Sequence, residues 1–305
     1  MIRAGVWLVL ASVLCGFTPA QFRTGVDAVR VDVLVTDGNR PLAGLVAADF
    51  DLRDAGVVQT IESVAVDDVP ISMMLVLDTS QSVAGGTLAR LIEGVRSALG
   101  LLTPQDRAAV MTFASDIRLV HDWSWDLGAA KNSVTTVPAG GGTSLWDATF
   151  AGLTHADTSP TVRRLVLVFS DGSDTTSWLP RRPVIEKARH TDAVVYAVSL
   201  RSQASAPAGA TLMGRSGIEL STKEAPMWLD TGFLEEVAEA TGGTEYLIQN
   251  SDDLRGAFGK IVTEFRTRYV LTYTPRGVDQ HGWHPVDVKL KARRGTVRAR
   301  RGYSR

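Results

Sequence analysis

Three short polar clusters in the sequence carry oxygen-bearing side chains at positions where chemistry can take place. They are residues 78–82 (DTSQS), 141–144 (GGTS) and 170–172 (SDG). The first and third follow directly on apolar runs, and the second opens a segment of helical periodicity. The oxygen donors that we single out in them are Asp78, Ser80, Ser82, Thr143 and Asp171.

These side chains are all hard oxygen donors, and the clusters contain no histidine or cysteine. Such a set suits Mg²⁺, Mn²⁺ or Ca²⁺ and disfavours zinc. Because only two of the ligands are carboxylates, a divalent cation is not surrounded by excess negative charge, and five protein oxygens, some acting through water, leave one coordination position free. We therefore expect one bound cation, Mg²⁺ before Mn²⁺ or Ca²⁺, with a position open to a carboxylate from a partner.

An α/β pattern surrounds the three clusters. Continuous apolar runs at residues 71–78 (ISMMLVLD) and 165–169 (LVLVF) are typical of central parallel strands buried on both faces. Further strands are predicted at 107–113, 117–123, 193–200 and 244–248, and helices at 87–102, 127–137, 145–156, 183–190, 233–240 and 252–265. Their alternation predicts a doubly wound, mostly parallel sheet with helices on both faces.

In such a sheet the loops at the carboxyl ends of the strands meet at one crevice. Clusters that lie more than sixty residues apart in the chain are therefore expected to come together. We expect the ligands to lie in surface loops, so that Asp78→Ala abolishes metal binding and leaves the fold largely intact. The helix from residue 145 is expected to direct its positive end at the same pocket.

The flanks of the α/β segment have the period-two alternation of half-buried strands. Strands are predicted at 29–36, 49–54 and 59–66, and again at 269–275, 284–291 and 296–303. Because neither set is large enough to bury a core, we predict one small β-domain from residues 21–68 and 269–305, with an α/β domain at 69–268 inserted. Two separate β appendages packed on the α/β sheet are the alternative. Residues 201–229 are predicted to form a long loop.

The first twenty residues have the layout of a secretory signal peptide. Arg3 precedes an apolar core at residues 6–14, and Ala20 is a small residue suited to cleavage. An uncleaved anchor and lipidation at Cys15, the single cysteine, are the alternatives. We therefore expect a secreted, periplasmic or envelope protein without disulfides. The net charge of −1 over 305 residues gives no basic excess for nucleic acid.

The clusters resemble a known family. DTSQS is similar to the Asp-x-Ser-x-Ser motif of von Willebrand factor type A domains, GGTSLWDA to their threonine-bearing second loop, and FSDG to their third loop. The resemblance covers about residues 69–268 and implies a metal-ion-dependent adhesion site at the five positions singled out above. The flanking β segments resemble those of a secreted bacterial group of von Willebrand-related proteins, which implies no known activity.

Two classes of function fit these motifs. In a binding module, the cation bridges to an exposed Asp or Glu of a protein partner; in a hydrolase, it activates water. The motifs contain no histidine or lysine to act as a base, and no GxxxxGK[ST] phosphate loop is present. We therefore expect a binding protein and not an enzyme. A scaffold in which the metal is only structural is the third possibility.

Several residues near the motifs have two interpretations. Ser144 competes with Thr143 as ligand or helix cap. Asp147 either accepts hydrogen bonds from the loops or is a solvated helix residue, and Asp174 is considered as an extra calcium ligand.

Aromatic residues outside the motifs also require an interpretation. Trp123 and Trp125 are expected to pack in the core or at a strand edge, with a partner contact as the alternative. His281 and His284 flank Gly282-Trp283 and are expected on the surface of a hairpin loop.

Overall fold

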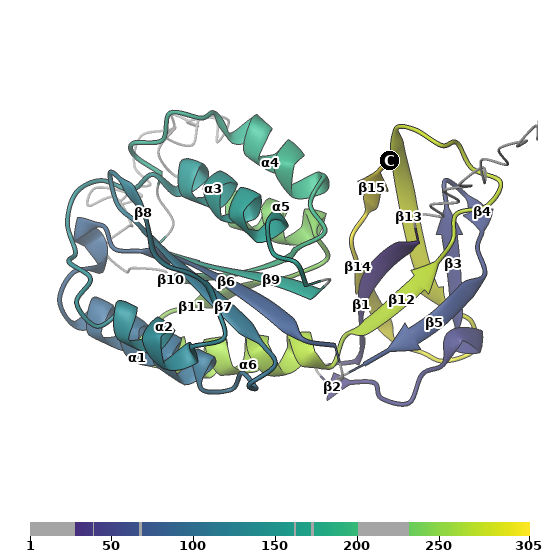
Figure 1. The fold of residues 1–305 in the computed structure, drawn as a ribbon, viewed down its shortest axis with the longest axis horizontal. Coiled ribbons are helices and arrows are strands. Elements are labelled where there is room, and N and C mark those ends of the chain that lie inside the picture. The colour runs from purple at the N-terminus through teal and green to yellow at the C-terminus, as the bar shows by residue number, and fades with distance from the viewer. Residues whose placement is uncertain (1–27, 39, 67–68, 162, 172–173, 201–231) are drawn as a thin grey trace, which may run out of the picture.

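The computed structural model describes residues 28–38, 40–66, 69–161, 163–171, 174–200 and 232–305. The predicted signal peptide and the predicted loop at 201–229 lie outside these ranges. Within them the chain forms an α/β unit and a β unit side by side (Figure 1). Among the described residues, no helix has the length and apolar character needed to cross a membrane.

The α/β unit is built on a six-stranded mixed sheet of order β11-β10-β9-β6-β7-β8. Its strands are β6 (Ile71–Asp78), β7 (Arg107–Phe113), β8 (Ile117–Ser124), β9 (Arg163–Ser170), β10 (Val194–Leu200) and β11 (Glu245–Ile248). All neighbours are parallel except β7 and β8, which are antiparallel. The predicted α/β class is thus confirmed.

Helices lie on both faces of this sheet (Figure 1). One face carries α1 (Gly86–Leu99), α2 (Leu127–Ser133) and α6 (Leu254–Arg266), and the other carries α3 (Leu145–Asp157), α4 (Arg181–Arg189) and α5 (Phe233–Ala240). Strand β6 is buried throughout, and its successive apolar side chains enter different cores. Met73 and Leu75 pack with α1 and α6, whereas Met74 and Val76 pack with α3 and α4.

Helix α2 is shorter than predicted, ending at Ser133 and not at Val137. The residues that follow are β-branched, and Val137 precedes Pro138, which disfavours helical backbone at that position. The chain therefore leaves the helix early and runs on toward the glycines at 140–142.

The strands of the β unit come from both ends of the chain. They are β1 (Val29–Asp37), β2 (Arg40–Pro41), β3 (Phe50–Asp54), β4 (Val57–Val58), β5 (Ile61–Ala65), β12 (Tyr269–Tyr273), β13 (Trp283–Leu290), β14 (Thr296–Ala299) and β15 (Gly302–Ser304). One sheet has the order β14-β1-β12-β5 with β2 beside β1, and the other has the order β15-β13-β3-β4. Because β1 pairs with β12 and β3 pairs with β13, N- and C-terminal strands share both sheets and one core.

The single strand predicted at 296–303 is wrong, because this segment forms two strands in different sheets. Strand β14 pairs with β1, and β15 pairs with β13. Between them the chain turns at Arg300, whose side chain is buried and contacts Asp192 and the Arg30 carbonyl. A strand that changes sheets in this way closes the corner of a β-sandwich.

The surface position predicted for His284 is also wrong. His284 lies in β13, is 2% exposed, and its Nδ1 lies 3.0 Å from Asp54 Oδ1. The other oxygen of Asp54 accepts hydrogen bonds from Tyr273 Oη at 2.9 Å and from Tyr303 Oη at 2.7 Å. One fully buried carboxylate thus joins β3, β12, β13 and β15.

A buried arginine connects the β unit to the α/β unit. Arg163, at the start of β9, donates through Nη2 to the carbonyls of Phe265, Arg266 and Arg268 at the end of α6. Its Nε lies 3.5 Å from Oδ1 of Asp32 in β1. The last carbonyls of a helix lack intrahelical partners, so this guanidinium satisfies them and neutralises the negative helix end.

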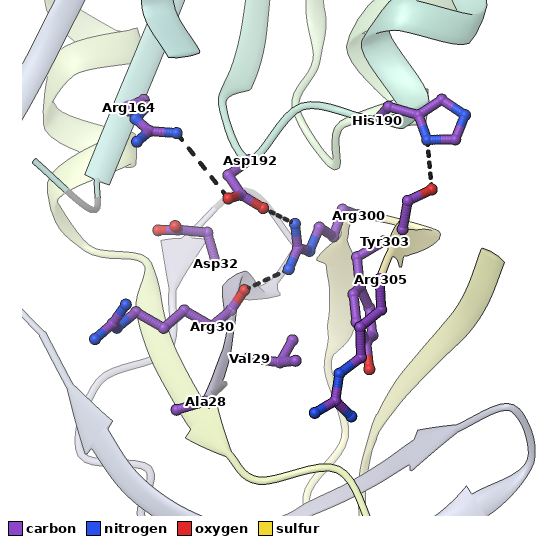
Figure 2. Close-up of a pocket in the computed structure, with 11 residues that line it drawn as sticks. Ala28, Val29, Arg30, Asp32, Arg164, His190, Asp192, Arg300, Tyr303 and Arg305 are labelled. Atoms are coloured by element: carbon purple, nitrogen blue, oxygen red, sulfur yellow. Dashed lines mark hydrogen bonds and ion pairs between the residues drawn. The ribbon is translucent and has the colours of Figure 1, made fainter. Parts of the chain in front are cut away.

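A second set of charges borders a cavity of about 450 Å³ at the same junction (Figure 2). Asp192 forms ion pairs with Arg300 and, at 4.0 Å, with Arg164. Arg300 also donates to the Arg30 carbonyl at 2.8 Å. These contacts hold the C-terminal segment against β1 and the α/β unit.

The Asp54 network should be a large contributor to the stability of the β unit. Asp54→Ala leaves two phenols and an imidazole without their buried partner, so we expect a loss of about 3–5 kcal/mol. Urea unfolding monitored by circular dichroism measures it. The control is Asp287→Ala, which removes an exposed ion pair from β13 and should change stability by about 0.5 kcal/mol or less. Equal losses in the two variants would contradict the assignment.

The same network predicts a loss of stability at alkaline pH. Burial, followed by the hydrogen bond and charge of Asp54, raises the pKa of Tyr303 to about 12, above about 10 for a free phenol. Tyr303 therefore makes its full contribution to the free energy of unfolding below pH 10, and this contribution is lost as pH rises through 12. Tyr303→Phe should reduce the slope of unfolding free energy against pH in this window by about 1.4 kcal/mol per pH unit. An unchanged slope would refute this.

Candidate metal centre

The first polar cluster extends from the carboxyl end of a central strand. Asp78 is the last residue of β6, and Thr79 anchors the following turn by donating its amide and its hydroxyl to the Phe113 carbonyl at 2.8 and 3.0 Å. Strand β6 also lies where the strand order reverses, with β7 on one side and β9 on the other. Ligands of open α/β sheets bind at such a reversal.

Hydrogen bonds connect the three clusters to one another. The Gln81 amide donates to the Gly141 carbonyl at 3.1 Å, the Thr175 amide donates to the Thr143 carbonyl at 2.8 Å, and Ser170 Oγ donates to Asp78 Oδ2 at 2.7 Å. The first bond links clusters one and two, the second fixes the loop after β9 to cluster two, and the third links clusters three and one. The structure therefore brings these sequence-distant segments together.

Glycine is required in the second cluster for steric reasons. Gly141 has φ +83°, and a Cβ atom there would lie 2.8 Å from Ser115 Oγ. At Gly142, a Cβ would lie 2.5 Å from the Thr176 side chain. Only glycines allow this loop to pass so close to its neighbours while presenting Thr143.

Asp78 is fully buried, which corrects the expectation that it lies in a surface loop. Its Oδ1 accepts the Ser80 amide at 2.9 Å, and its Oδ2 accepts the Ser170 hydroxyl. The hydroxyls of Ser80 and Ser82 lie 3.0 Å apart. Asp78→Ala would therefore leave two donors without their partner and would not be neutral for the fold.

Burial raises the pKa of Asp78 to about 6, hydrogen bonds from Ser80 oppose the rise, and the charge of Asp171 adds to it. Two carboxylates thus act on each other in a site with little solvent. A cation bound between them would remove both the repulsion and much of the cost of burying the charge.

The other predicted ligands lie around Asp78 at different depths. Ser80 and Thr143 are almost fully buried, Asp171 is half-buried, and Ser82 is exposed. Side-chain or electrostatic contacts join Asp78, Ser80, Ser82 and Asp171, whereas Thr143 is connected through the backbone of its loop. The donor set is all oxygen and contains two carboxylates, which fits a small hard cation. In the described ranges, no group of three or more His, Cys, Asp or Glu suited to a metal was found.

The loop after β9 is fixed to the start of α3 by two aspartates. Asp147 accepts the amides of Trp178 and Leu179, both at 2.8 Å, so the loop-binding interpretation of this residue is correct. Asp174 accepts the Trp146 amide at 3.2 Å and the Ser177 hydroxyl. The carboxylate of Asp174 therefore caps α3, a role that the sequence did not lead us to predict.

Sequence reasoning also overlooked the hydroxyls of this loop. Ser177 Oγ accepts the first amides of α3, those of Trp146 and Asp147, both at 3.1 Å. Thr175 Oγ1 accepts the Thr143 amide at 2.8 Å, and Ser144 Oγ lies 2.8 Å from Thr176 Oγ1. The run DTTS at residues 174–177, which lies directly after the third cluster, is the sequence feature that could have indicated these contacts. The loop after β9 thus occupies the positive end of α3.

The remaining predicted residues lie outside this centre. Trp123 stacks on His155 with ring centroids 5.5 Å apart and packs on the α3 core, as expected. Trp125 is 60% exposed and lies under the guanidinium of Arg107, 4.0 Å from the ring centroid.

Comparison with known proteins gives one family and several solved structures. The von Willebrand factor type A domain family matches residues 73–173. A solved von Willebrand factor type A protein from Catenulispora acidiphila has 15% identity and a TM-score of 0.53, over 86% of this chain and 75% of that one. At this identity the likeness concerns the fold alone.

Two further solved structures have lower scores. BatB from Bacteroides thetaiotaomicron has 16% identity and a TM-score of 0.49, over 64% of this chain and 98% of that one. The von Willebrand factor domain of the type V pili tip protein Mfa5 from Porphyromonas gingivalis has 11% identity and a TM-score of 0.45, over 64% and 94%. Scores below 0.5 support no argument. A search of curated proteins gave no match.

The buried charge of Asp78 should destabilise the metal-free protein. Because its pKa is raised, the Asp78 carboxyl costs no stability below pH 3.8. The free energy of unfolding falls as pH rises from 3.8 through about 6, and at pH 7.5 this loss is at most about 3 kcal/mol. Asp78→Asn removes the charge and retains an acceptor for the Ser80 amide. We expect it to raise the melting temperature in chelator at pH 7.5, and Asp78→Ala to lower it. A gain for Asp78→Asn that persists at pH 4 would contradict this explanation.

Proposed function

Since this chain carries a von Willebrand factor type A domain, we propose that its three clusters bind one divalent cation, with Mg²⁺ favoured over Mn²⁺ and Ca²⁺. The bound cation captures an exposed Asp or Glu of a partner protein. The observation that carries the proposal is the buried Asp78 carboxylate, destabilised beside Asp171 and surrounded by hydroxyl donors. The ligands are Asp78, Ser80, Ser82, Thr143 and Asp171.

The arrangement of the sheet supports a single crevice for this cation. We take the sheet to be doubly wound, with the site outside the carboxyl ends of β6 and β9. These two strands are parallel neighbours in register, with Leu77 opposite Phe169, so Asp78 and Ser170 leave the sheet together. Side chains that follow adjacent parallel strands face the same crevice.

Charge explains why the partner group is acidic. Two carboxylates neutralise a divalent cation formally, but Asp78 shares its charge with the hydrogen-bond donors Ser80 and Ser170. Hydroxyl ligands add no charge. The open coordination position therefore prefers a negative oxygen, and the low local dielectric strengthens that preference.

Binding is favoured over hydrolysis by the composition of the loops. None of the five histidines lies in the three clusters, and three of them have partners elsewhere. His155 stacks on Trp123, His190 contacts Ser304 and His284 contacts Asp54. A cation-activated water would thus have no histidine base in these loops.

We further propose that residues 69–268 form the binding domain and that residues 21–68 and 269–305 form one β-domain beside it. The pairing of β1 with β12 and of β3 with β13 supports this division. Export through a signal peptide at residues 1–20 is part of the proposal and would bring the site to partners in the envelope or outside the cell.

Calorimetry with MgCl₂ on the full chain tests the metal site. We expect one site in roughly the micromolar to millimolar range, as for weak Mg²⁺ and Ca²⁺ sites, no binding in Asp78→Asn, and weaker binding by about tenfold or more in Thr143→Ala. Asp287→Asn, the same change at an exposed carboxylate of β13, is the matched control and should bind as the unaltered chain does. Binding that survives Asp78→Asn would remove the proposed site.

A further inference from the structure

Trp178 is the most exposed large apolar side chain of the described residues, at 94%. Single exposed apolar residues are common on protein surfaces. An indole with almost no intramolecular contact is different, because a tryptophan is the side chain that loses most by staying in water. This side chain contributes little to the fold around it, so its presence requires another explanation.

The backbone under Trp178 is held rigidly. Its own amide and the next one, that of Leu179, both donate to Asp147 at 2.8 Å, and the Leu179 side chain packs on the core beneath α3 and α4. Asp147 is itself in the first turn of α3. The indole is therefore presented outward from a fixed position, which lowers the entropic cost of a contact with another molecule.

This position is on the rim of the candidate metal centre. The segment that carries Trp178 is the one that hydrogen-bonds the second cluster, through Thr175 to Thr143 and through Thr176 to Ser144. Trp178 is two residues beyond Thr176. The indole is therefore carried by the same loop that contacts Thr143 and Ser144, and its backbone is held by Asp147, one helical turn after Thr143.

We propose that Trp178 is the apolar anchor of the partner site, and that the recognised element is an acidic side chain accompanied by an apolar or aromatic side chain in the same short segment. The inference rests on the proposed function. The cation takes the carboxylate, and the indole covers the apolar neighbour. Each contact is weak alone, but two contacts on one segment reinforce each other because the second forms intramolecularly. Tryptophan is among the residues that most often dominate binding energy at interfaces.

The test uses the full chain with MgCl₂ and two synthetic peptides, acetyl-Gly-Phe-Gly-Asp-Gly-Phe-Gly-amide and acetyl-Gly-Gly-Gly-Asp-Gly-Gly-Gly-amide. We expect the phenylalanine peptide to bind about tenfold more tightly or better, and Trp178→Ala to abolish this preference while leaving the affinity for Mg²⁺ unchanged. The matched control is Trp125→Ala. Trp125 is also exposed, but it follows β8, whose end pairs with the start of β7, whereas Asp78 pairs with the last residue of β7, at the other end of that strand.

The outcomes separate this inference from the proposed function. Equal affinities for the two peptides, or a preference that survives Trp178→Ala, overturn the role of Trp178 and leave metal-dependent capture standing. Loss of Mg²⁺ binding by Asp78→Asn together with no binding of either peptide overturns acid capture and the anchor alike. Self-association of the unaltered chain that Trp178→Ala abolishes, measured by sedimentation velocity, assigns the indole to a second copy and also overturns the proposal.

Discussion

The guanidinium of Arg163 is the buried contact that joins the α/β unit, helix α6 and the β unit. It is fully buried, satisfies the last carbonyls of α6, and faces Asp32 in the first strand of the β unit. A buried charge of this kind is costly unless its partners are in place, so it specifies one relative position for the sheet, helix α6 and the β unit. Arg163 begins β9, and the same strand ends at Ser170, which donates to Asp78. One central strand therefore connects the junction of the two units to the candidate metal centre.

At the other end of β9, the site is built from loops that hold one another in place. The loop after β9 caps α3 through Asp174 and Ser177, and α3 in turn holds that loop through Asp147. This reciprocal arrangement fixes the second cluster before any ligand arrives. Preorganised donors lower the reorganisation cost of binding, which would favour the proposed cation in a site with only two carboxylates.

Much of this architecture follows from local patterns in the sequence. The unbroken apolar runs of β6 and β9 predicted strands buried on both faces, and the motifs after them predicted which loops meet. The predictions that the structure contradicts concern features that depend on contacts between distant residues, with one exception in strand β13. The break at Arg300 depends on Asp192, more than one hundred residues away, and the burial of Asp78 depends on Ser170. His284 is different, because its alternation with Val286 and Val288 is a strand pattern present in the sequence. The neighbouring Gly282 favours a turn, which led to the prediction of a surface loop.

Two of the fully buried aspartates that the structure describes, Asp54 and Asp78, show how a carboxylate satisfied within the fold differs from one that is not. Asp54 is surrounded by two phenols and an imidazole from three other strands, so its charge is satisfied within the core and stabilises it. Asp78 has two donors from its own motif and from β9, and a second carboxylate acts on it, with the result that burial raises its pKa to about 6. Folding alone gives no compensation for that repulsion, whereas a bound cation does. A group kept in an unfavourable environment is a candidate functional site, and the proposed cation would relieve the repulsion between Asp78 and Asp171.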